Sequence, residues 1–146
     1  HGDWPAGTYL LNPEGFRHAP FSRHGCVLFV KLRQFPGRDR EHRVVDVNAL
    51  EWEPSSVAGV LHKPLYRQRG YADRTRLERW QPAIEPGSIV YADGAELFVL
   101  SGGFEDEAGR YGAGSWLRLP AGATIVFHKE IQKAEAPDRA VPRAEV

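Results

Sequence analysis

Few side chains in this sequence have types and spacing that could support chemistry. It holds six histidines and one cysteine, Cys26, which excludes an internal disulfide and a cysteine-rich zinc module. Gly114-Ser115-Trp116 lacks the second glycine of a Gly-x-Ser-x-Gly nucleophile turn, and no glycine-rich phosphate loop is present. The strongest candidate is His18, which ends the spaced run Gly7-x5-Pro13-x-Gly15-x2-His18. Imidazole in such a run points to metal chemistry, provided that other ligands lie close by.

Charge and hydropathy exclude several classes of partner. Lysine plus arginine is 19 and aspartate plus glutamate is 19, so the net charge is zero and a general nucleic-acid binder is disfavoured. Arginines alternate with aromatic residues over Tyr66–Trp80, but Asp73 and Glu78 interrupt them, so we expect a solvated strand face. No apolar run approaches the ~20 residues of a membrane helix. We therefore expect a soluble cytoplasmic protein that contacts neither nucleic acid nor membrane.

The elements that position these residues are predicted to be short strands. Glycine (15) and proline (11) are abundant in the 146 residues, and no long segment shows helical periodicity. This pattern predicts an antiparallel sandwich or barrel. Strands are expected at 8–12, 26–34, 43–50, 57–62, 75–80, 88–91, 96–101, 115–119 and 124–128. Cys26, at the start of an apolar run, is expected to be buried.

An internal repeat is the most informative feature. Residues 2–15 align without a gap to residues 109–122, with identity at two glycines, an alanine, a leucine, a proline and a final glycine. Each copy predicts a turn, a strand and a Pro-x-Gly turn. About 60 residues of strands precede the second copy, whereas one residue precedes the first, and the chain holds no methionine. We therefore expect a two-barrel parent protein that has lost the opening half of its first barrel.

The residues around His18 resemble those of a known family. The run ending at His18 matches the second cupin motif, Gly-x5-Pro-x-Gly-x2-His. Together with Gly25–Leu32 it resembles the ChrR-type cupins, relatives of the cupin domain of the zinc anti-sigma factor ChrR. The resemblance implies an all-β bicupin of jelly-roll barrels. It divides the chain into a half barrel at 1–35, a charged linker at 36–43, a complete barrel at 44–128 and a flexible tail at 129–146.

The resemblance also implies where metal ligands would lie. A cupin holds Zn, Fe or Mn with a His-x-His pair and a Glu from the first motif and a last His from the second. Aligned on Gly102 and Gly122, these four positions of the complete barrel are Ile89, Tyr91, Ala95 and Ile125. Glu96 is one residue out of place and is expected on the opposite face.

The ligand positions lead to a functional hypothesis and an alternative. We expect a non-enzymatic binding or regulatory module whose 44–128 barrel holds no metal and takes a small apolar molecule among Ile89, Tyr91, Ala95 and Ile125. The alternative is a metal-dependent cupin enzyme, dioxygenase- or isomerase-like, with Zn, Fe or Mn in the truncated first barrel and His18 as a ligand. The apolar run at 27–32 predicts a homo-oligomer or association with the missing upstream half. No anti-sigma zinc domain is recognisable.

Overall fold

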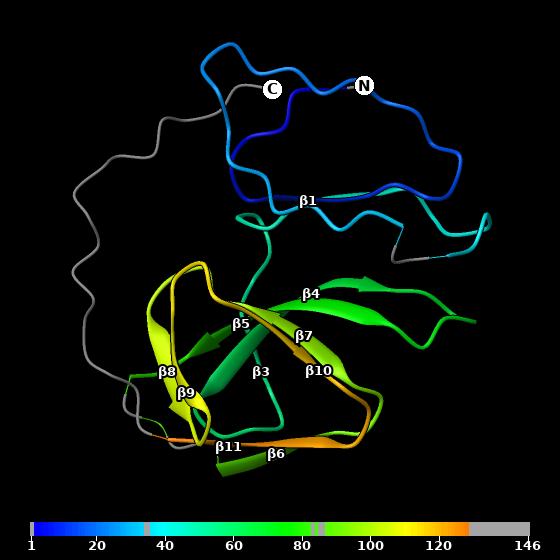
Figure 1. The fold of residues 1–146 in the computed structure, drawn as a ribbon. Coiled ribbons are helices and arrows are strands. Elements are labelled where there is room, and N and C mark those ends of the chain that lie inside the picture. Colours follow the sequence, from blue (N-terminus) through cyan, green and yellow to red (C-terminus); the bar gives the residue numbers. More distant parts are fainter. Residues whose placement is uncertain (1, 34–35, 83, 85–86, 129–146) are drawn as a thin grey trace. The chain divides into compact units, whose positions relative to one another are not determined.

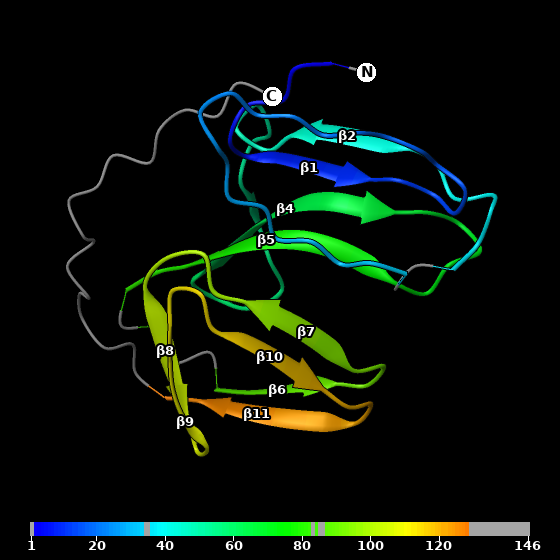
Figure 2. The ribbon, with the colours of Figure 1, turned by 45° about the horizontal axis from the view of Figure 1, so that its top comes forward.

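The computed structural model describes residues 2–33, 36–82, 84 and 87–128, and every regular element within them is a strand. Figure 1 shows the chain as a set of short strands joined by turns, and Figure 2 shows them after a 45° turn. The predicted all-β class is confirmed. The strands are β1 (Thr8–Leu11), β2 (Arg43–Asp46), β3 (Glu53–Pro54), β4 (Val60–Arg67), β5 (Arg74–Trp80), β6 (Gly87–Tyr91), β7 (Ala95–Phe98), β8 (Gly103–Asp106), β9 (Gly109–Gly112), β10 (Trp116–Leu119) and β11 (Ala123–Phe127).

The described residues form two compact units. One contains 2–33, 36–53 and 62–78, and the other contains 54–61, 79–82, 84 and 87–128. β1, from the segment predicted as a half barrel, pairs with β2, which lies at the start of the segment predicted as a complete barrel. The assignment of each segment to a half barrel or a complete barrel stays a prediction, and the predicted tail at 129–146 lies outside the described residues.

In the first unit, β1 and β2 form an antiparallel pair in which Tyr9 lies opposite Val45. β4 carries much of the buried core: Leu65 and Tyr66 are buried, as is Lys63. The Lys63 ammonium donates to the carbonyl oxygen of Val47 at 2.8 Å and lies 4.8 Å from the ring centroid of Trp52. A buried cation needs such partners, because desolvation otherwise penalises its charge.

The second unit contains three antiparallel strand pairs and a cluster of aromatic rings. β6 pairs with β11, β7 with β10, and β8 with β9. Trp80 meets Phe127 edge-on at 4.5 Å between ring centroids, and Phe104 contacts both rings at 5.7 and 5.2 Å. Edge-to-face packing suits the ring quadrupoles and stabilises this aromatic cluster.

The internal repeat is visible in the backbone. Thr8 N donates to Pro5 O at 3.2 Å, and the equivalent Ser115 N donates to Gly112 O at 3.0 Å. In the second turn, Phe16 N donates to Pro13 O at 3.0 Å, and Ala123 N donates to Pro120 O at 3.1 Å. The glycines of both turns have positive φ in both copies: +89° and +87° at Gly7 and Gly114, and +87° and +80° at Gly15 and Gly122. β1 and β10 are therefore equivalent strands.

Two local predictions are wrong. The strand expected at 26–34 is absent over its described residues, 26–33, where Val27 is 91% exposed and Cys26 is exposed rather than buried. A strand forms only where another strand satisfies its main chain, and none pairs with this segment among the described residues. The segment predicted as a charged linker, 36–43, is exposed at four charged or polar positions and buried at one. Arg38, Asp39, Glu41 and His42 are exposed, but Arg40 is buried by partners from β4 and the loop before β5.

Candidate functional site

Three of the four residues aligned with cupin ligand positions lie on one face of the β6–β11 pair. Ile89 lies directly opposite Ile125, and Tyr91 lies opposite Ala123. Directly paired residues, and residues two apart on one strand, point to the same face. Ile125 is 4% exposed, whereas Val90, on the other face, is 64% exposed. The covered face is thus apolar, with Ile89, Ile125 and Phe127, and Tyr91 adds one hydroxyl.

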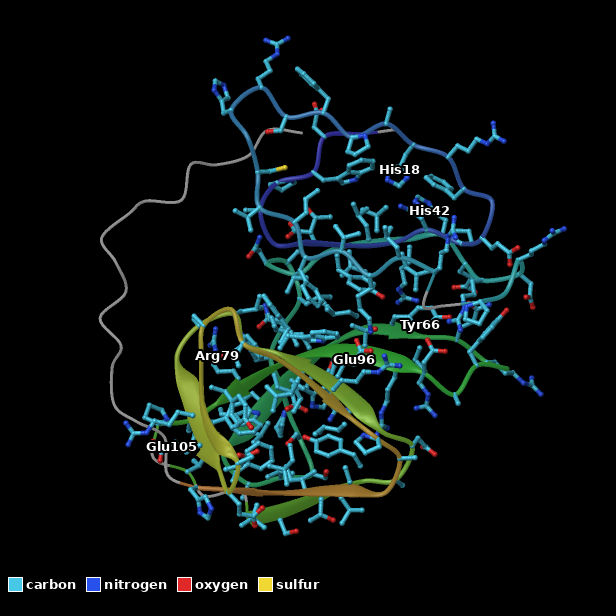
Figure 3. The ribbon with its side chains drawn as sticks, viewed as in Figure 1. His18, His42, Tyr66, Arg79, Glu96 and Glu105 are labelled. Carbon is cyan, nitrogen blue, oxygen red and sulfur yellow. The ribbon has the colours of Figure 1, made fainter. Side chains whose placement is uncertain are left out.

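The fourth position, Ala95, begins β7 and pairs with Leu119 of β10. Its neighbour Glu96 pairs with Arg118, and Glu96 Oε1 lies 3.8 Å from the guanidinium Nε of Arg118. Figure 3 shows where Glu96 lies among the side chains. Strand parity places Glu96 and Arg118 on the face opposite Ala95, but the Glu96 side chain is only 19% exposed and so is not open to solvent. The misplaced carboxylate therefore does not share a face with Ala95.

His18 lies in the first unit, within a small group of rings. Asn12 Nδ2 lies 3.4 Å from His18 Nδ1, and the Phe16 ring centroid lies 5.8 Å from the His18 ring. His42 stacks on the same Phe16 ring at 4.6 Å and 11°, and Figure 3 labels both histidines in this unit. Sequence reasoning missed His42. Extending the β1–β2 register by one residue places His42 opposite Asn12. The sequence alone does not show that β1 and β2 pair, so it could not show this proximity.

This set of side chains does not fit a cupin metal centre. The described residues contain no group of three or more His, Cys, Asp or Glu side chains placed to hold a metal ion. His18 contacts an amide and a phenyl ring, neither of which is a strong ligand for Zn, Fe or Mn. At the β6–β11 positions the side chains are two isoleucines and a tyrosine.

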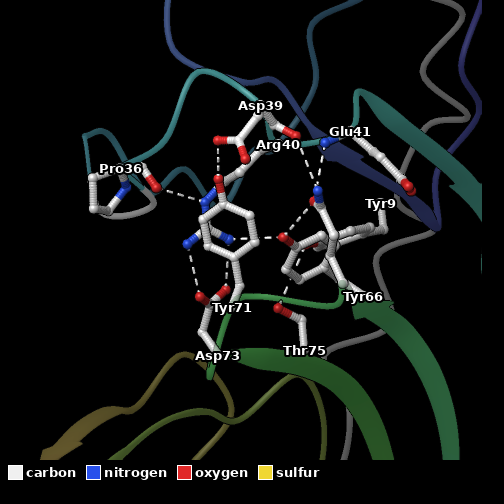
Figure 4. Close-up of polar contacts among 10 residues, drawn as sticks. Tyr9, Pro36, Asp39, Arg40, Glu41, Tyr66, Tyr71, Asp73 and Thr75 are labelled. Atoms are coloured by element: carbon white, nitrogen blue, oxygen red, sulfur yellow. Dashed lines mark hydrogen bonds and ion pairs between the residues drawn. The ribbon is translucent and has the colours of Figure 1, made fainter.

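The densest polar network surrounds Arg40. Its side chain is 3% exposed, and its two terminal nitrogens donate to the Asp73 carboxylate at 2.9 and 2.7 Å. One of them also donates to the Tyr66 hydroxyl at 2.8 Å, and Nε donates to the carbonyl oxygen of Pro36 at 2.8 Å. The guanidinium carbon lies 3.9 Å from the centroid of the Tyr71 ring. Figure 4 shows these contacts converging on one side chain.

Further hydrogen bonds extend the network and shift the pKa values of its titratable side chains. Tyr71 donates its hydroxyl hydrogen to Asp39, and Gln68 Nε2 donates to Asp39 O at 2.9 Å. Hydrogen bonds from Arg40 hold the pKa of Asp73 below its usual value, and the hydrogen bond from Tyr71 does the same for the pKa of Asp39. The pKa of Tyr71 is raised, chiefly by the same bond to Asp39. The network fixes 36–41 onto β4 and the loop before β5, so its role is structural.

The other candidates lie apart from these groups. His62 lies 3.7 Å from Glu53, an exposed carboxylate, and His24 and His128 are exposed. The arginines of 66–80 that alternate with aromatic residues are exposed, as predicted for a solvated strand face: Arg67, Arg69, Arg74, Arg76 and Arg79. No helix within the described residues is long and apolar enough to cross a bilayer.

Comparison with known protein families agrees with the motif at His18 and with the all-β fold. The model of the ChrR cupin-like domain matches residues 1–36 and 40–135, which is most of the chain. No curated protein matches the sequence significantly. The family match covers both copies of the internal repeat and all the strands of both units. The chain therefore belongs to the ChrR cupin-like domain family.

Proposed function

We propose that this chain is a non-enzymatic cupin module that binds a small apolar molecule against the covered face of β6–β11 and acts as a binding or regulatory domain. One observation carries the proposal: Ile89 lies opposite Ile125 on the covered face of β6–β11, where the family resemblance implies histidine ligands. Aliphatic side chains at these positions offer no donor atoms to a metal. They offer instead an apolar surface that favours burial of an apolar ligand.

The chemistry of the ligand follows from the same face. Tyr91 contributes the one hydroxyl among the four aligned positions and would orient a ligand through a single hydrogen bond. Small binding sites in proteins commonly combine apolar walls with one or a few placed polar groups. The neutral composition of this face gives no counter-charge for a phosphate or carboxylate. We therefore propose an aromatic or aliphatic ligand with one hydrogen-bonding group.

Ligand titration tests this function. Purified wild-type protein is titrated by calorimetry with a panel of small phenols and with sugar phosphates of similar size. We expect binding of a member of the phenol panel, and weakening by about 5- to 10-fold in Tyr91→Phe, since one hydrogen bond contributes about 1 kcal/mol. Ser88→Ala, on the exposed face of the same strand, is the matched control and should leave the affinity unchanged. Preferential binding of a sugar phosphate would contradict the proposal.

The alternative, a metal-dependent enzyme using His18, gains no support from the surroundings of that residue. Asn12 and Phe16 contact the imidazole, and neither supplies a carboxylate or a second imidazole. The other histidine near Phe16 is His42, which the cupin motif does not include. The binding module is therefore the function that the described residues support best.

A further inference from the structure

β1 and β10 are equivalent strands of the repeat, yet each pairs through a different edge. Val99 N, just after β7, donates to Ser115 O at 3.0 Å, so the Ser115 carbonyl points toward the β7 side of β10. In the first copy, Val47 N, just after β2, donates to Gly7 O at 2.9 Å. Gly7 corresponds to Gly114, one residue before Ser115. Because successive carbonyls of a strand point to opposite edges, β2 occupies the edge of β1 opposite to the edge through which β10 pairs with β7.

The edge of β1 that corresponds to the β7 side carries the carbonyl of Thr8 and both main-chain groups of Leu10, while the Thr8 N–H donates to Pro5 O in the preceding turn. Among the described residues, β2 is the only strand paired with β1. The backbone thus presents N–H and C=O groups on this edge in the same spacing that β10 uses to pair with β7. Such an edge is a template for another strand.

The two equivalent strands also differ in which face of side chains is covered. Leu117, which faces the covered side of β10, is 8% exposed, whereas its equivalent Leu10 is 39% exposed. Conversely, Leu11 is buried, whereas its equivalent Arg118 is exposed. The face that is covered in the second copy is therefore open in the first. Other apolar residues of the same unit are also exposed: Phe16, Phe21, Val27, Leu28, Val30 and Leu32.

We propose that the Thr8–Leu10 edge of β1 is an acceptor site for one extended strand that none of the described residues supplies. The occupant has the chemistry of β7: an antiparallel strand with small or apolar residues at alternate positions. By equivalence with the β7–β10 pair, its inward side chains cover Leu10, as Leu97 lies opposite Leu117 in the second copy. The repeat, rather than exposure alone, specifies this occupant, because the second copy shows what covers the equivalent strand.

A peptide probe tests the acceptor site in the intact chain. The probe is a synthetic peptide of residues 94–101, which contains β7 with its flanks. In the β7–β10 pair the main chain of Leu97 points toward β10, and that of Phe98 points away. N-methylation at Leu97 should therefore weaken binding at least about tenfold, while N-methylation at Phe98 should leave it unchanged. The two peptides have identical composition, so each controls for the hydrophobicity of the other.

The location of binding is read by amide hydrogen exchange and by one variant. Peptide addition should slow exchange at Leu10, and Leu10→Pro should abolish binding. Proline is tolerated at this position because the Leu10 N–H points toward the unpaired edge. Protection at Leu117 instead of Leu10, equal binding of both methylated peptides, or protection of Leu10 in a homodimer without peptide would each overturn the proposal. If Leu10→Pro fails to fold, the comparison of the two N-methylated peptides with the wild-type protein still tests the proposal.

Discussion

Removing the Asp73 carboxylate should destabilise the protein measurably, because the buried guanidinium of Arg40 would lose its counter-charge. Asp73 accepts two hydrogen bonds from Arg40, at 2.9 and 2.7 Å. Hydrogen bonds to charged groups contribute about 1.5–3 kcal/mol each, but the Asp73 side chain is 33% exposed, so water replaces part of the loss. We expect Asp73→Ala to lower the free energy of unfolding by about 2–3 kcal/mol, using these magnitudes.

Denaturation with urea and with heat measures this loss. For a chain of this size, 1 kcal/mol corresponds to roughly 2–4 °C, so the melting temperature should fall by about 4–12 °C. The control is Glu14→Ala, which removes a carboxylate 3.5 Å from Arg38 where both side chains are mostly exposed. That change should cost less than about 0.5 kcal/mol.

A double-mutant cycle separates the ion pair from packing. Arg40→Met removes the cation and keeps an apolar stem between Tyr66 and Tyr71. The double variant Arg40→Met with Asp73→Ala should recover most of the stability lost in Asp73→Ala, because no uncompensated buried charge remains. An Asp73→Ala loss below about 0.5 kcal/mol, the range of an exposed pair, or a double variant that merely adds both losses, would refute a buried, mutually dependent pair.

The remaining predictions concern local strain, exposure and pH. Gly94→Ala should destabilise the second unit by about 1–3 kcal/mol, because φ is +79° and a Cβ would lie 2.8 Å from the carbonyl oxygen of Leu119. Urea unfolding measures this loss beside the control Gly15→Ala, where φ is +87° but no atom lies within 4 Å of the added Cβ. Equal losses in the two variants would contradict the steric part of the explanation. Cys26 should react with a thiol reagent in the native protein as fast as in urea, since it is exposed, and strong native protection would show that the segment is covered. Because the folded-state pKa of Asp73 is lowered, its contribution to stability is fully present above its unfolded pKa of about 3.9 and is lost as the pH falls toward the folded-state pKa. The difference in unfolding free energy between wild type and Asp73→Ala should therefore shrink below about pH 4. A difference that grows there would show that the pKa is raised on folding.

Strands with local apolar alternation were predictable from the sequence. The expected segments at 8–12, 88–91 and 115–119 agree with β1, β6 and β10 to within about a residue at each end. The repeat was also readable, because its glycines and prolines mark turns that need positive φ or a fixed proline φ.

Other elements could not be recognised locally. The β8–β9 hairpin is rich in glycine, and its turn depends on Asp106 Oδ1, which accepts from Ala108 N at 2.7 Å and Gly109 N at 3.0 Å. β4 contains Pro64, which disfavours a strand on sequence grounds. The predicted strand at 26–34 had the right composition, but a strand also needs a partner, which composition does not supply.

The candidate site was predictable only in part. Alignment identified Ile89, Tyr91 and Ile125, but only the β6–β11 register shows that Ile89 and Ile125 are direct partners. The burial of Arg40 was not predictable, because its partners Tyr66 and Asp73 lie 26 and 33 residues away. Such contacts depend on the folded chain rather than on local pattern.

Metal analysis tests the central claim most directly. Wild-type protein is produced in medium supplemented with zinc, iron and manganese, dialysed, and assayed by inductively coupled plasma mass spectrometry beside His18→Ala. Because Ile89, Tyr91, Ala95 and Ile125 stand where cupin ligands would lie, we predict metal far below one ion per chain in both proteins. One tightly bound ion per chain that survives in His18→Ala would place a metal centre outside the His18 motif and contradict the account.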